Sequence, residues 1–276
     1  MRNLRFLSYF LVVVAALSLA ACKKDNASVP PQQQPEPATV MADCYQVKNR
    51  PVKTFTWEYT PGKFRNATLE WNSQGRLKSI HVKNNEDEGT VYRVAYLKDS
   101  LVLDMKIYNA SEEVNILTPV SLQDGCARNF WGLTSPEFPV YELLGQYTFD
   151  NGHLIAKQFV GEEAPQTYVW KNACLVSSAR PDGDTWYYEY TDKPAKGGIV
   201  AFLIDGLGAD SFAANYLCGF AGIANLPAKV EFQAGGSTER RTELTFTYET
   251  DADGFVTGMT YHSRTLGFDP AWTFTY

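Results

Sequence analysis

Four aromatic side chains are the residues of this sequence best suited to bind a ligand. Trp186, Tyr187 and Tyr188 are consecutive, so in a strand at least one of them points away from the main apolar face. Trp131 lies in a stretch without clear alternation, where binding residues are common. Exposed rings can hold a glycan by stacking or a hydrophobic ligand by burial, whereas the alternative for each ring is packing between strands.

Residue patterns that would support catalysis are weak. The three histidines, His81, His153 and His262, are far apart in sequence and fall within or beside predicted strands. The chain has no G-x-S-x-G nucleophile turn, no H-E-x-x-H zinc-protease pattern and no complete G-x-G-x-x-G. Residues 251–254 lack the later glutamate of a calcium loop and are typical of a hairpin turn. We expect no enzyme, no metal and no cofactor, although a spatially defined carboxylate pair for glycoside hydrolysis stays open.

Cys22 is the residue whose setting most clearly predicts a modification. Arg2 and Arg5 form a basic start, residues 6–16 are largely apolar, and Leu19-Ala20-Ala21 leads directly into the cysteine. This arrangement is typical of a lipoprotein signal peptide, in which the thiol receives a diacylglyceryl group before cleavage. We therefore expect residues 1–21 to be removed and Cys22 to attach the protein to the outer membrane, on either its periplasmic or its cell-surface side.

Residues 22–42 comprise the lipidated cysteine and a flexible tether rich in proline, glutamine and alanine. Removal of residues 1–21 takes away two arginines and no acidic residue, which changes the net charge from −6 to −8. An acidic chain without basic clusters argues against nucleic acid as a partner. Residues 43–276 follow as a single β-rich domain, since a second linker is not apparent.

Four cysteines remain after lipidation: Cys44, Cys126, Cys174 and Cys218. The compartment permits disulfides, and four cysteines allow three pairings among which the sequence does not choose. Since no C-x-x-C pair occurs, neither a zinc site nor a thioredoxin-like motif is indicated.

Alternation of aromatic residues with threonine is the dominant structural signal. In residues 54–59, 244–249 and 272–276 the large apolar side chains fall on one face and the polar side chains on the other. This pattern predicts antiparallel strands with one buried face and one solvated face. A turn motif recurs between such strands: an aromatic residue, a short polar turn and an aliphatic residue, as in residues 71–77 and 149–154.

Two stretches interrupt this pattern. Residues 109–145 contain three prolines and predict a long irregular connection. Residues 192–227 are rich in glycine and include a short helical candidate that Gly219 can end. The predicted fold is mainly β: an antiparallel β-meander curled into a half-open barrel or sandwich, with one short helix in the 205–220 region closing its open end.

The C-terminal half carries a resemblance. Asn-Leu-Pro-Ala-Lys at 225–229, the turn at 251–255 and the aromatic–threonine end at 273–276 resemble Bacteroidota lipoproteins with an uncharacterised domain described as having a porin-like fold. This chain has Ala228 where we expect threonine. The resemblance implies the fold and the envelope location, and it brings no catalytic residues.

Short candidate strands with charges on their outer faces argue against a barrel that inserts into the membrane. The leading hypothesis is therefore a lipid-anchored, non-catalytic binding or structural module of the cell envelope. One alternative is a carrier whose aromatic-lined concave face holds a lipid or hydrophobic peptide. Another is an unrecognised glycan-active enzyme.

Overall fold

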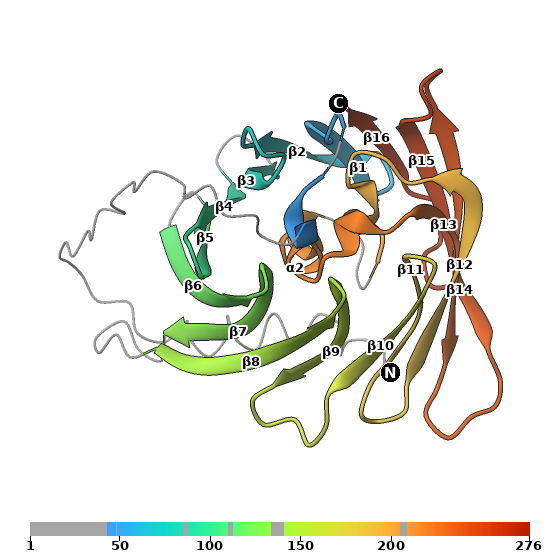
Figure 1. Ribbon diagram of the computed structural model, residues 1–276. Helices are drawn as coiled ribbons and strands as arrows, with labels where there is room; N and C mark the ends of the chain where they lie inside the picture. Colours follow the sequence, from blue (N-terminus) through green and yellow to red (C-terminus); the bar gives the residue numbers. More distant parts are fainter. Residues whose placement is uncertain (1–42, 48, 85–87, 110–112, 134–140, 205–208) are drawn as a thin grey trace. The chain divides into compact units, whose positions relative to one another are not determined.

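The computed structural model describes residues 43–276, apart from 48, 85–87, 110–112, 134–140 and 205–208. In these residues sixteen antiparallel strands form one closed barrel (Figure 1). The strands are β1 Thr54–Thr60, β2 Lys63–Trp71, β3 Leu77–Lys83, β4 Gly89–Tyr96, β5 Ser100–Tyr108, β6 Glu113–Gln123, β7 Cys126–Leu133, β8 Tyr141–Asp150, β9 His153–Phe159, β10 Gln166–Lys171, β11 Cys174–Ala179, β12 Thr185–Pro194, β13 Asn225–Gln233, β14 Arg241–Thr250, β15 Val256–Ser263 and β16 Ala271–Thr275. The helical segments are η1 Asp43–Tyr45, η2 Ile199–Phe202, α2 Ala209–Leu217 and η3 Phe220–Gly222.

The meander closes completely, which corrects the prediction of a half-open barrel or sandwich. Each strand pairs with its sequence neighbours, and β1 pairs with β16 through Phe55 opposite Phe274 and Trp57 opposite Trp272. Closure satisfies the backbone groups that an open sheet would leave at its two edges. The aromatic–threonine patterns at the two ends of the described chain therefore form one seam.

The predicted irregular connection at 109–145 is also wrong. It contains β6, β7 and the start of β8, and β6 alone is paired with β5 over its first nine residues. Pro119 is opposite Val102 within this ladder, so proline did not exclude a strand here. Trp131 consequently lies in β7, opposite Leu143 of β8, and not in a loop.

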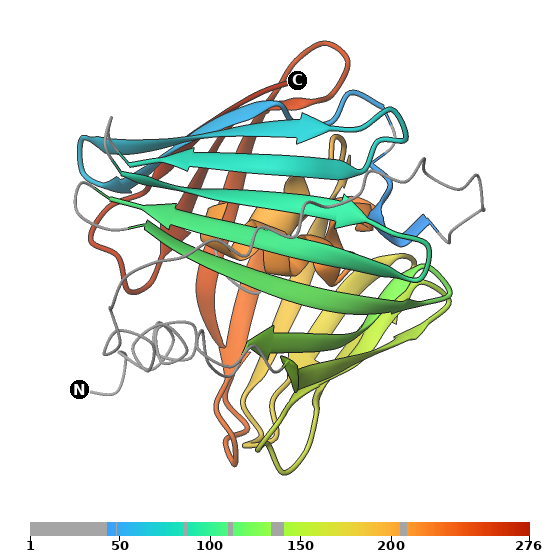
Figure 2. The same cartoon turned by 90° about the vertical axis from the view of Figure 1, so that its left-hand side faces the viewer.

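The predicted helix is confirmed as α2. It lies with η2 and η3 in the long connection between β12 and β13, and the three segments are inside the ring of strands in both views (Figures 1 and 2). Gly219 follows α2 with a φ of 76°, a left-handed conformation that favours glycine. We call residues 195–224, as far as they are described, the plug.

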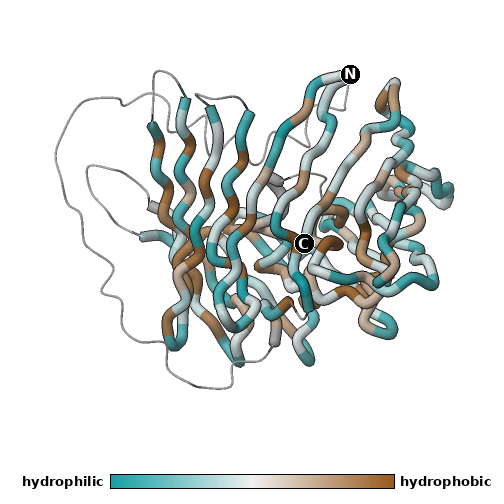
Figure 3. The backbone as a smooth tube through the Cα atoms, turned by 90° about the horizontal axis from the view of Figure 1, so that it is seen from above, coloured by the Kyte–Doolittle hydropathy of each residue, from teal (hydrophilic) through white to brown (hydrophobic). Residues whose placement is uncertain are grey.

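Contacts with the plug identify the inner face of the barrel. The rings of Phe55 and Phe274 lie 4.3 and 6.2 Å from the ring of Phe202 in η2. Residues that are paired with these two across neighbouring strands therefore point inward, and so do residues two positions away from them on the same strand. Hydropathy alternates along many of the strands, as Figure 3 shows.

The connections sort into two ends of the barrel. All connections from an even to an odd strand lie at one end, as antiparallel neighbours require, and the plug is one of them. The recurrent turn motifs, including the Asn151-Gly152 turn with both φ values positive, are at this same end. We call it the plug end and the opposite one the open end.

The segment before β1 is also fixed at the plug end. A disulfide joins Cys44 in η1 to Cys126 at the start of β7. This is one of the three pairings that the sequence allowed. Cys174 and Cys218 keep their thiols, and Cys218 is buried.

Candidate ligand-binding site

The plug end is sealed by the aliphatic residues that follow its turns. The aliphatic residue that ends the turn motif is a fully buried leucine on four different strands: Leu77, Leu101, Leu154 and Leu175. The aromatic residues before the turns pack beside them, and Trp170 donates from Nε1 to the carbonyl of Leu154 at 2.7 Å. The repeated motif thus builds a ring of apolar side chains around the plug.

Buried tyrosines attach the plug to the barrel wall. The hydroxyl of Tyr216 in α2 accepts hydrogen bonds from the backbone N–H of Leu77 at 2.9 Å and from the hydroxyl of Tyr96 at 3.2 Å, and donates to the carbonyl of Tyr45. Tyr45 in turn donates to the carbonyl of Leu217 at 3.2 Å. Burial raises the pKa of Tyr216 to about 12 and the pKa of Tyr45 further, so both hydroxyls stay protonated at neutral pH.

The inner face is different at the open end, where apolar side chains are left partly exposed. A series of residue pairs across neighbouring strands connects Ile116 of β6 to the buried Leu69 of β2, so both side chains lie on the inner face. Phe159 pairs with Gly145, which is two residues from the buried Tyr147 on the same strand, so Phe159 also faces inward. Tyr59, Val114 and Phe159 are each 42–43% exposed. We call the following set the mouth surface: Tyr59, Val114, Ile116 and Phe159.

Polar groups also lie inside the open end. Lys157 of β9 is opposite Gln166 of β10, and its ammonium is 5.8 Å from the ring centroid of Tyr168. Gln166 is only 8% exposed, and its Nε2 donates no hydrogen bond in the structure. On the other side of the barrel the guanidinium of Arg65 lies 4.5 Å from the ring centroid of Tyr59. An apolar surface beside a few polar donors is the usual composition of a small-molecule site.

The predicted aromatic residues separate into different environments. Trp186 is in register with Ser178 on the inner side of β12, near the open end, with its ring 5.1 Å from Phe232. Tyr187 points to the other side, where the guanidinium of Arg240 lies 3.5 Å from its ring centroid. Tyr188 is buried, and its hydroxyl is 3.2 Å from that of Ser178. These three rings therefore do not form one platform.

Trp131 has a different location from the one expected. It is partly exposed and lies near the open-end terminus of β7. Its partner Leu143 lies just beyond the bulge that interrupts the β7–β8 ladder after Phe130. Binding by Trp131 and Trp186 stays a prediction, whereas Cys22 lies outside the described residues.

The turn at 251–254 is confirmed as a hairpin turn between β14 and β15. Asp251 accepts hydrogen bonds from the backbone N–H groups of Asp253 and Phe255 at 3.0 and 2.8 Å. Arg50 bridges both carboxylates at 3.6 and 3.2 Å, and Lys196 of the plug donates to the carbonyl of Asp253. These cations tie the segment before β1 and the plug to the turn. In the part of the chain that the structure describes, no three His, Cys, Asp or Glu side chains gather as a metal site would require.

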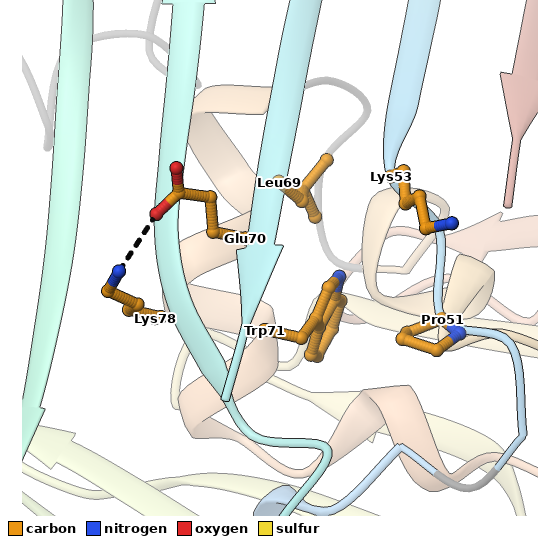
Figure 4. Close-up of a pocket in the computed structure, with 6 residues that line it drawn as sticks. All are labelled: Pro51, Lys53, Leu69, Glu70, Trp71 and Lys78. Atoms are coloured by element: carbon orange, nitrogen blue, oxygen red, sulfur yellow. Dashed lines mark ion pairs between the residues drawn. The ribbon is translucent and has the colours of Figure 1, made fainter. Parts of the chain in front are cut away.

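An open depression of about 400 Å³ lies where the segment before β1 meets β2 (Figure 4). It is lined by Pro51, Lys53, Leu69, Glu70, Trp71 and Lys78. Glu70 and Lys78 form an ion pair of 3.2 Å, which lowers the pKa of Glu70. Trp71 is held by its own bond from Nε1 to the carbonyl of Val52 at 2.7 Å. Because Glu70 is paired with Lys78 and the Trp71 N–H is already bonded, this depression has less to offer a ligand than the mouth surface.

The outer wall of the barrel carries ion pairs beside exposed apolar side chains. Arg93 pairs with Asp104 at 3.4 Å and Lys106 with Glu113 at 2.7 Å, each across neighbouring strands. Phe64, Leu117 and Val169 are exposed on the same face. Among the described residues, no helix is both long and apolar enough to cross a membrane.

The fold is porin-like. A porin-like protein from Bacteroides uniformis is similar over 82% of this chain and 97% of its own length, with a TM-score of 0.51 and 16% sequence identity. A porin-like protein from Bacteroides vulgatus covers 83% of this chain and 99% of its own length, with a TM-score of 0.42 and 15% identity. No family model matches the chain, and neither does any curated protein.

Proposed function

We propose that this chain is a lipid-anchored, non-catalytic binding protein of the cell envelope, which holds an apolar ligand inside the open end of its barrel. The observation that carries the proposal is the mouth surface: large apolar side chains that face inward and are nevertheless partly exposed. Covering such a surface is favourable at about 25 cal/mol per Å² of apolar area. The plug end offers no such surface, because its inner residues are already buried.

The rest of the chain fits this role. The lipobox predicts attachment through Cys22, and the tether leads to η1 and the disulfide at the plug end. The plug blocks one end of the barrel, which favours a container over a channel. The ion pairs on the outer wall favour a domain that stays beside the membrane while its lipid anchor holds it there.

The test uses two neighbouring residues of β6 that point to opposite sides. Ile116 belongs to the mouth surface, whereas the adjacent Leu117, 39% exposed, is on the outer wall. Binding of the uncharged dye N-phenyl-1-naphthylamine is followed by fluorescence, and dodecanol is the competitor. Ile116→Asn should weaken dye binding several-fold, and Leu117→Asn should leave it unchanged, with circular dichroism confirming that both variants fold. Absence of dye binding to the wild type, or equal losses in both variants, would contradict the proposal.

Mass spectrometry of the native protein, purified without denaturant, gives an independent readout. A bound apolar molecule should accompany the wild type and be depleted in Ile116→Asn.

A further inference from the structure

We infer that the ligand is a long, linear hydrocarbon chain, which lies along the inner faces of β5 and β6 between the mouth and the plug. This inference rests on the proposed function and adds the chemical class of the ligand and the wall that holds it. The wall consists of partly exposed residues, which we call the inner strip: Leu103, Met105, Ile107, Val114, Ile116 and Thr118.

Strand pairing places the inner strip inside the barrel. Met105 pairs with Ile116 on one side and with Tyr92 on the other. Tyr92 pairs with Ile80, which pairs with Leu69, and these three residues are buried in the core. The remaining residues of the strip are two positions from Met105 or Ile116, or pair with a residue that is, so they point to the same side.

The inner strip has a rim at the mouth and a floor at the plug. Val114 at the rim is 43% exposed, whereas the pair formed by Leu101 and Val120 at the other end is fully buried. Tyr96, opposite Leu101, has its hydroxyl 3.2 Å from that of Tyr216 in the plug, so the plug closes the strip at this level. The distance along β6 from Val114 to Val120 is about 20 Å.

The chemistry of the inner strip argues against a polar ligand. Its side chains are apolar except for the hydroxyl of Thr118, and the charged residues Asp104, Lys106 and Glu113 alternate to the outer face. The backbone of β5 is paired with β4 and with β6. A peptide or a glycan lying here would leave most of its polar groups without partners, which costs free energy. A hydrocarbon chain has no such groups.

The shape of the inner strip favours a linear chain over a fused-ring compound. Two neighbouring strands make a strip about 10 Å wide, which is half of its length of about 20 Å. An extended chain advances about 1.2 Å per bond, since the three backbone bonds of one residue span about 3.3–3.6 Å. The strip therefore accommodates at most about 16 carbons. Free alkyl amphiphiles and the acyl groups of membrane lipids share this chemistry.

Chain length is the variable that tests the inference. Octyl, decyl, dodecyl and 6-cyclohexylhexyl maltoside share one uncharged headgroup, and the last two have the same number of carbons in the tail. Each displaces N-phenyl-1-naphthylamine, below its critical micelle concentration, from the mature chain carrying Cys22→Ala, so that no attached lipid competes. Affinity should rise about two- to fourfold per methylene from octyl to dodecyl. Dodecyl maltoside should bind about fivefold or more tightly than the cyclohexyl compound.

Variants of Thr118 locate the chain, because this residue lies between Ile116 and the floor. Thr118→Val removes the hydroxyl of the strip and should tighten dodecyl maltoside binding about two- to fourfold. Thr118→Phe fills the strip above the floor, so dodecyl maltoside should fall to the affinity of octyl maltoside, which should change less than about twofold. The same substitutions at Thr167, which is exposed and adjacent to the inward-facing Tyr168, are the matched controls, and circular dichroism confirms that each variant folds.

Three results would overturn this inference and leave the apolar site standing: equal affinity for octyl and dodecyl maltoside, equal affinity for dodecyl and 6-cyclohexylhexyl maltoside, or a Thr118→Phe variant that weakens all chains alike or none. Failure of the wild type to bind the dye would remove the proposed function as well. Native mass spectrometry after incubation with dipalmitoylphosphatidylglycerol vesicles, and separately with hexadecanoate, distinguishes the sources. A retained phospholipid would identify a lipid acyl chain, retained hexadecanoate alone a free amphiphile, and retention of neither would contradict the inference.

Discussion

Replacing Tyr216 with phenylalanine should destabilise the barrel by about 2–6 kcal/mol, although the ring itself is kept. The lost hydroxyl is the acceptor for the N–H of Leu77 at 2.9 Å and the donor to the carbonyl of Tyr45. Both backbone groups would remain buried between the plug and the wall. A buried polar group that loses its partner costs about 1–3 kcal/mol, and two such groups are affected.

Urea unfolding at neutral pH, followed by tryptophan fluorescence, measures this loss. With a slope of about 3 kcal/mol per molar urea, expected for a domain of this size, the midpoint should fall by about 1–2 M. Tyr59→Phe is the control, because Tyr59 is 42% exposed at the open end and its hydroxyl makes no hydrogen bond recorded among the described residues. A Tyr216→Phe midpoint equal to that of Tyr59→Phe would show that the tyrosine cluster does not hold the plug.

Three further outcomes are expected. Burial raises the pKa of Tyr216 from 10.0 to about 12. The stability that depends on its protonated hydroxyl is therefore complete below pH 10 and is lost as the pH rises towards 12. The urea midpoint of the wild type should fall over this range, and it should fall less steeply in Tyr216→Phe. The Cys44–Cys126 disulfide spans 82 residues, so Cys126→Ser should lower the free energy of unfolding by up to about 4 kcal/mol in non-reducing urea titrations, and an unchanged midpoint would assign the disulfide no structural role. Metabolic labelling with a palmitate analogue should tag the wild type and not Cys22→Ala, and equal labelling of the two would refute the lipid anchor.

Local patterns in the sequence predicted the strands and turns well. The aromatic–turn–aliphatic motif was visible at residues 71–77 and 149–154, and in the structure it sets the register of hairpins and the buried ring at the plug end. These features depend on neighbours in sequence, which is why alternation and turn chemistry were sufficient.

Closure of the barrel was beyond such reasoning. It depends on Phe55 meeting Phe274, a pairing between the two ends of the domain that no local pattern encodes. The strand β6 was missed for another reason. Its inner residues Val114 and Ile116 are left partly exposed, and outer Leu117 is apolar, so the contrast between its two faces is weak.

The mouth surface was missed for the same physical reason. An inward-facing residue is buried or exposed according to where the plug ends, and only the three-dimensional structure fixes that boundary. Trp131 and Trp186 were chosen from the sequence for their ring chemistry, and both lie near the open end.

The covalent link between Cys44 and β7 also decides how the domain responds to mechanical load. A pull from the N-terminal side enters at Cys44 and divides between β7 and, through Tyr45, the last residues of α2. Tension is thus shared by the sealed half of the barrel before it reaches the seam between β1 and β16. The opposite rim, where the mouth surface lies, is the part of the domain farthest from that path, so a pull at the N-terminal side would strain it least.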